Sequence, residues 1–339
     1  MTLGQHLARH ASKYLFVTAL VLLALLWDWN WFRPLVQTQL ASQLQRPVAI
    51  GHFDLDLGRS TTVRLQGLEV GNPQDFATDT PPLVQIQTLA LTLDGLGLFQ
   101  HRVSVQTLTV VQPVLHVAKN ANGRSNAVLP PSSGGPSAWA VEVLKLAIEN
   151  GRFAYDDPAG KATFRGSIQT QAADDDEDRV VARAEGRYQD APLQARFTGG
   201  SLLALRDAAK PYPVDFALDT GNTHITLKGS LLDPVKLAGA ALQLQLAGDD
   251  LAKLFPLVPV ALPHTAAYRL SGALDYTQGT VRFKDFAGVL GSSDLSGTAS
   301  VRRVETRPVL EADLSSKQLL LADLAGLIGA TPGKPGSAN

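Results

Sequence analysis

Two groups of carboxylates offer the clearest opportunity for chemistry in this sequence. Asp249 and Asp250 are adjacent, and residues 174–178 read Asp-Asp-Asp-Glu-Asp. Paired carboxylates can perform general acid–base catalysis, but sequence neighbours are badly placed to share one substrate and well placed to cap a helix. The acidic run could bind a hard cation such as calcium, yet it lacks the alternating ligand spacing and the glycine of a calcium loop. We therefore expect a helix cap and a solvated turn.

Other catalytic signatures are missing from the sequence. The seven histidines are scattered and fall in no metal-ligand spacing, and the absence of cysteine excludes disulfides, thiol nucleophiles and cysteine-ligated zinc. There is no G-x-S-x-G elbow, P-loop or dinucleotide fingerprint, because Gly95-Leu96-Gly97 lacks the later glycine and the βαβ setting. The sequence predicts a protein that is not an enzyme, with no cofactor and no metal site. Charged residues make up 18% of the chain and the net charge is −1. This charge balance gives no indication of a nucleic-acid partner.

The remaining candidate for function is the apolar face of a sheet. From Val48 onward, apolar residues alternate with polar ones, which predicts half-buried strands and a mostly β fold with few short helices. Where the alternation shifts phase, as at Gly67, we expect glycine bulges that curve the sheet. The candidate residues of this face come from the last third of the chain, where the pattern is clearest: Leu242, Leu244, Leu246, Leu270, Leu274, Phe283, Leu295, Leu310 and Leu314.

Such a face has two interpretations. Alternation usually means a sheet that covers a closed core, as in a sandwich or barrel. The expected helices are too short and too few to cover a long sheet, however, so the sheet must curl on itself or present the face to something else. A groove that holds acyl chains would satisfy the pattern.

The helices that we expect are short. Val36, Leu40 and Leu44 recur every four residues between Pro34 and Pro47, which predicts an amphipathic helix that lies on a bilayer surface or packs on its own domain. Two further helices are expected at residues 249–255, with a capping aspartate, and at 319–328. The segment Asn150-Gly151 is expected to be a hairpin turn.

Residues 14–32 are expected to be a transmembrane anchor. The first fourteen carry no charge, and Trp27, Trp29 and Trp31 at the far end resemble an interfacial aromatic belt. A cleaved signal is the alternative, but the small residues that signal peptidase prefers are missing after the apolar run. Arg9 and Lys13 precede the span, so the positive-inside rule predicts a cytoplasmic N-terminus and an exported remainder.

The chain divides by composition into six parts. We expect a cytoplasmic N-terminus at 1–13, the anchor at 14–32, a β module at 33–129, a Pro/Ser/Gly linker at 130–138, a larger β module at 139–329 and a flexible tail at 330–339. The tail is typical of a linker. A fragment, a short paralogue and a segment that depends on a partner all remain open.

Several short motifs stand out over most of the chain. In the first half they are Arg46-Pro47-Val48, Gly71-Asn72-Pro73, Asn122-Gly123 and Asn126. In the last third they are Gly248-Asp249-Asp250-Leu251, Leu262-Pro263, Tyr268-Arg269-Leu270-Ser271-Gly272, Gly291-Ser292-Ser293-Asp294-Leu295-Ser296-Gly297, Arg307-Pro308-Val309-Leu310 and residues 315–329. Together these motifs resemble the AsmA family of bacterial envelope proteins. Many members of that family carry tryptophan after the asparagine that corresponds to Asn126, where this chain has Ala127.

These motifs consist of turn residues and glycines, so the resemblance identifies a fold rather than a catalytic site. It implies an inner-membrane protein with a periplasmic bulk and an antiparallel sheet folded lengthwise into an apolar groove. It also implies kinship with bridge-like lipid-transfer proteins that carry phospholipid between the membranes. Outer-membrane or periplasmic partner proteins are expected, and a structural role in outer-membrane protein assembly is the alternative. Some eighteen strands about 4.8 Å apart would span roughly 85 Å.

Overall fold

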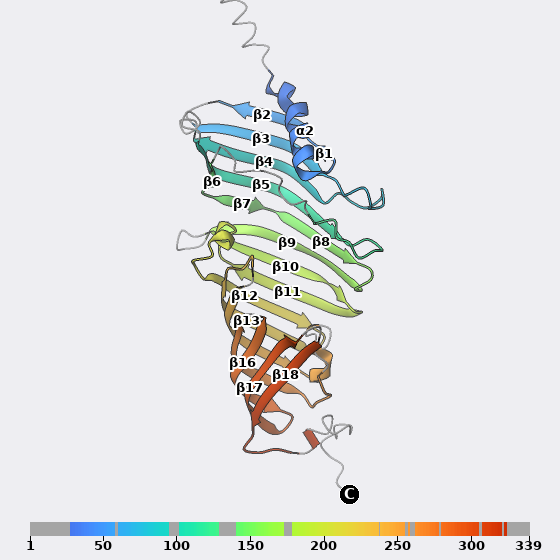
Figure 1. Ribbon diagram of the computed structural model, residues 1–339, viewed down its shortest axis with the longest axis vertical. Coiled ribbons are helices and arrows are strands. Elements are labelled where there is room, and N and C mark those ends of the chain that lie inside the picture. The colour runs from blue at the N-terminus through green and yellow to red at the C-terminus, as the bar shows by residue number, and fades with distance from the viewer. Residues whose placement is uncertain are drawn as a thin grey trace, which may run out of the picture.

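One long, curved, open β-sheet makes up most of the computed structural model (Figure 1). The structure describes residues 28–57, 60–94, 102–128, 140–172, 178–236, 238–254, 257, 262–277, 279–304, 307–320 and 322–323. The mostly β prediction is confirmed. Strands β2 to β11 stack along the long axis and run across it, whereas β16 to β18 are turned steeply, so the sheet is strongly twisted.

The described residues form 18 strands. Their bounds are β1 (Val48–Ala49), β2 (His52–Asp56), β3 (Ser60–Val70), β4 (Val84–Asp94), β5 (Arg102–Ala118), β6 (Ala140–Val143), β7 (Leu146–Glu149), β8 (Gly151–Asp157), β9 (Ala162–Ala172), β10 (Asp178–Tyr188), β11 (Ala191–Gly199), β12 (Tyr212–Thr220), β13 (Thr223–Leu232), β14 (Gly239–Gly248), β15 (Tyr268–Thr277), β16 (Thr280–Leu290), β17 (Ser293–Val304) and β18 (Arg307–Ser315).

The pairing is sequential and antiparallel with one exception. Strands β8 to β18 form an uninterrupted series of antiparallel neighbours, and β3, β4 and β5 do the same at the other end. Strand β5, however, pairs in parallel with β6, β7 and β8. The purely antiparallel expectation is therefore wrong at this point. A parallel return needs a long crossover, which residues 119–139 supply between the end of β5 and the start of β6.

The parallel pairing also corrects two other expectations. Asn150 is not a hairpin turn, because β7 and β8 on either side of it continue in the same direction along β5.

In the described part of the chain, β1 and β2 share one position beside β3, and β6 to β8 share one position beside β5. The 18 strands thus occupy 15 positions, which gives about 70 Å at about 4.8 Å per strand rather than 85 Å.

The phase shift expected at Gly67 is present, and it belongs to a line of irregular residues that runs from β3 to the start of β8. Gly67 in β3 and Gln112 in β5 have φ angles of 61° and 49°, and Asn150, between β7 and β8, has 52°. These left-handed residues shift the parity of each strand by one residue. Leu65 and Leu68 consequently pack in the same cluster although they are an odd number of residues apart.

The amphipathic helix is α2 (Arg33–Leu44), with proline in its first turn and Gln45 as a left-handed C-cap at φ 51°. Three of its apolar residues pack against the buried cluster of the sheet: Val36, Leu40 and Leu44. The Trp-rich end of the expected anchor, residues 28–32, forms the 3-10 helix η1 (Trp29–Phe32), capped by the Asp28 side chain, and Trp29 packs against the same cluster. The rest of the expected anchor lies outside the described residues. Within those residues, the helices are too short or too polar to cross a membrane.

The motifs of the first half meet in one hydrogen-bonded cluster. The amide of Asn126, which is fully buried, donates to the side chain of Asn72 (2.8 Å) and to the His116 carbonyl (2.9 Å). The buried guanidinium of Arg46 donates to the carbonyls of Asn126 and Val128. These contacts tie the end of α2, the loop after β3 and the turn after β5 together. They give the motif residues a structural role.

Candidate functional site

The register places the nine candidate residues on one face of the sheet. Directly paired residues of antiparallel strands project to the same side. Leu246 pairs with Leu270, and Leu242 pairs with Leu274, which in turn pairs with Phe283. Leu295, Leu310 and Leu314 join the same face through Gly288, Val301 and Gly297, their respective partners on the neighbouring strands. We call this side the apolar face.

The nine residues lie in three different environments. Leu270 is 6% exposed and belongs to a buried cluster, defined here as the C-terminal cluster: Leu254, Tyr268, Leu270, Phe286 and Leu290. Leu246, Phe283 and Leu295 pack against that cluster, and Leu242, Leu244 and Leu274 are half-buried. Leu310 and Leu314 on β18 are 43% and 52% exposed. The candidate set therefore includes both covered and open parts of the face.

A short segment after β14 covers the C-terminal cluster. The 3-10 helix η4 (Leu251–Leu254) contributes Leu254, and Leu251, Leu257 and Leu262 pack beside it. The cap of this helix is Asp250, whose carboxylate accepts the amide protons of Ala252 (2.9 Å) and Thr265 (3.0 Å) and contacts His264 (2.7 Å).

The other member of the carboxylate pair has a different role. Asp249 accepts a hydrogen bond from Asn222 and lies 3.6 Å from the Lys253 ammonium.

Burial alone would raise the pKa of Asp250, but the hydrogen bonds from His264, Ala252 and Thr265 outweigh the effect of burial, so the pKa of Asp250 is lowered. Structural capping at this pair is confirmed, with Asp250 as the cap.

Phe286, which is 4% exposed, is a buried aromatic residue that the sequence pattern missed. Asp285, at φ 47°, inserts an extra residue into β16, where the register with β17 shifts between Phe283 and Phe286. Both rings consequently lie on the apolar face and stack, with centroids 4.8 Å apart and planes 9° apart. The signal in the sequence was the break in alternation at this point, which strict two-residue periodicity cannot accommodate.

The apolar face also continues far beyond the predicted residues. Through the middle strands, defined here as β8 to β12, it presents half-buried aromatic rings: Phe153, Tyr155, Phe164, Phe197 and Phe216. Several lie over glycines. A side chain at Gly166 would collide with the Phe153 ring, and a Cβ at Gly199 would lie 2.7 Å from Phe197. Glycine here lets an aromatic ring approach the backbone closely.

The cover differs along the face. At the N-terminal end, α2 and η1 pack on a cluster that includes Val48, Phe53 and Leu65. At the other end, η4 packs on the C-terminal cluster. Single residues of the middle strands, such as Val180 and Leu193, are buried, and the short 3-10 helix η3 (Leu203–Arg206) lies in the connection from β11 to β12, but the described residues form no third buried cluster.

The opposite side of the sheet is polar. Gln243 and Gln245 alternate with the leucines of β14 and are exposed, as the parity predicts.

The described residues hold no group of three histidine, aspartate or glutamate side chains that could bind a metal ion. Residues 174–177 of the acidic run lie outside the described residues, and Asp178 forms an ion pair with Lys145 at 3.3 Å.

Comparison with known proteins gives one family. The AsmA family profile matches residues 11–177 and 128–338 of the chain. The AsmA family protein YhjG of Escherichia coli (strain K12) is 29% identical over 369 aligned residues, which cover 96% of this chain and 53% of YhjG. The chain therefore spans about half the length of that relative. No solved structure matches.

Proposed function

This chain belongs to the AsmA family, and we propose that the apolar face of its sheet shields phospholipid acyl chains. The observation that carries the proposal is the open stretch of the face over β8 to β12, where aromatic rings on neighbouring strands stay half-buried. Large contiguous apolar surfaces are rare on soluble proteins unless they bind a partner, a membrane or a ligand. An extended apolar strip that crosses several strands suits a chain-like ligand better than a compact one.

The proposal includes a place in the cell. The anchor at residues 14–32 would hold the chain in the inner membrane with its bulk in the periplasm. Phospholipid would then move along the sheet between the inner and outer membranes, with further protein partners at the ends. At about 70 Å the sheet is short for a whole envelope, so we propose that this chain provides one segment of a longer path.

Site-specific photo-crosslinking in cells tests the proposal. A photoreactive residue at Phe197 on β11 should capture phospholipid, whereas one at the neighbouring Thr198, on the polar face, should not. Leu244 and Gln243 on β14 provide a second matched pair with the same opposite orientation. Capture at both members of a pair, or at neither, would contradict the proposal.

A substitution distinguishes an open face from a closed core. Leu244 is half-buried, so Leu244→Asp should block lipid capture at Phe197 while the sheet stays folded, because water can reach the carboxylate. If Leu244→Asp unfolds the protein and no apolar position captures lipid, the face is a closed core. The alternative role, a structural factor in outer-membrane protein assembly, would then be favoured.

A further inference from the structure

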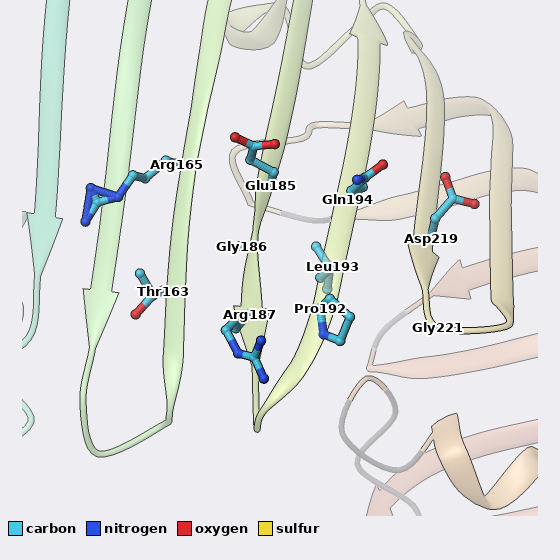
Figure 2. Close-up of a pocket in the computed structure, with 10 residues that line it drawn as sticks. All are labelled: Thr163, Arg165, Glu185, Gly186, Arg187, Pro192, Leu193, Gln194, Asp219 and Gly221. Carbon is cyan, nitrogen blue, oxygen red and sulfur yellow. The ribbon is translucent and has the colours of Figure 1, made fainter.

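The polar face of the middle strands carries a concentration of arginine that the net charge of the chain conceals. Arg152, Arg165, Arg183, Arg187 and Arg196, together the arginine cluster, line two adjoining hollows of ≈ 630 and ≈ 660 Å³ on β8 to β12. Figure 2 shows the first hollow, with Arg165 and Arg187 on one side and Asp219 on the other. All five arginine side chains are exposed to solvent.

The acidic residues of the hollows do not neutralise this charge. Only two carboxylates, Glu185 and Asp219, stand among the lining residues. Asp219 lies 3.3 Å from Arg196, and Arg187 donates to the carbonyl of Asp190. Arg165 is paired in register with Glu185, yet its side chain is turned away from that carboxylate (Figure 2). Within the described part of the chain, Arg152, Arg165 and Arg183 form no ion pair.

The register places like charges beside one another. Arg183 on β10 is directly opposite Arg196 on β11, and Ser167 on β9 separates it from Arg152 on β8. Like charges in directly opposite positions destabilise a sheet. A bound anion would remove this repulsion, so the arrangement favours an anionic ligand over an empty surface.

We propose that the arginine cluster is a binding site for phosphate groups. The planar guanidinium binds two oxygens of a phosphate at once, which the compact ammonium of lysine cannot do, and each of these five basic positions is arginine. The phosphate belongs either to a soluble compound or to a lipid headgroup at a bilayer surface. Because the cluster lies on the face opposite the aromatic rings, it is separate from the acyl-chain surface and does not depend on the proposed function.

Pyrophosphate titration of the full chain tests the site. Wild-type protein should bind pyrophosphate saturably, with an affinity that falls as salt is added, because the attraction is between charges. The double variant Arg165→Gln/Arg183→Gln should bind at least tenfold more weakly. Arg269→Gln is the matched control, since Arg269 is exposed on the polar face of β15 outside the cluster, and it should bind as wild type does. Circular dichroism checks that each variant is folded.

Vesicle flotation separates the two sources of phosphate. If wild-type protein binds vesicles that contain phosphatidylglycerol, and the double variant does not, the ligand is a lipid headgroup. Binding of pyrophosphate without binding to those vesicles assigns a soluble phosphate compound. The proposal fails if neither probe binds, or if the double variant binds as tightly as Arg269→Gln.

Discussion

The C-terminal end of the sheet and its middle share one apolar face but differ in exposure. Phe286, beneath η4, is 4% exposed, whereas Phe197 and Phe216 in the middle strands are half-buried. The strands of both regions alternate in the same way. The difference arises from the connections, since the segment after β14 folds back over the face. Covered and open surface can thus be produced by the same strand pattern, and only the open part is accessible to a ligand.

The largest expected effect comes from placing a charge in each region. Leu270→Asp should destabilise the protein by about 4 kcal/mol or more, because an unpaired carboxylate would be buried in the C-terminal cluster. Phe197→Asp should cost only about 1–2 kcal/mol, since water reaches that side chain. Chemical unfolding monitored by circular dichroism measures both. Equal losses would mean that the two regions do not differ in cover.

A smaller effect is expected where rings lie over glycine. Gly166→Val should cost about 1–3 kcal/mol, because a side chain there would collide with the backbone oxygen of Arg183 and displace the Phe153 ring. Ser167→Val is the control on the exposed polar face next to it and should change the unfolding free energy by less than about 0.5 kcal/mol. If the glycine variant is as stable as the control, the ring does not rest on the backbone of β9.

The smallest expected effect concerns the cap that holds the cover in place. Asp250→Ala should cost about 1 kcal/mol at neutral pH through loss of capping. Asp249→Ala should cost less, because its contacts are exposed. The pKa of Asp250 is lowered in the folded protein, so its contribution is complete above the unfolded pKa and disappears as the pH falls through the folded pKa. Unfolding curves should therefore separate the wild type from Asp250→Ala by more at pH 7 than at pH 3.

The alternation of apolar residues predicted the sheet, its apolar face and the shared orientation of the nine candidates, because strand parity is a local property. It could not predict the parallel pairing of β5, which depends on a crossover of some twenty residues. At Asn150 and Asp285, left-handed residues shift the strand parity, and a break in alternation does not show which residue adopts that conformation. The covering of the C-terminal cluster is a tertiary contact. The sequence also did not predict the arginine cluster, because its members are far apart in sequence and come together only across neighbouring strands.

The central claim is that the open part of the apolar face binds acyl chains. Native mass spectrometry of protein purified from cells in mild detergent tests it most directly. Wild-type protein should retain phospholipid, and the variant Phe164→Asp/Phe197→Asp, altered only in the middle strands, should lose it while remaining folded. Wild-type protein that carries no phospholipid, or a variant that retains as much as the wild type, would contradict the claim.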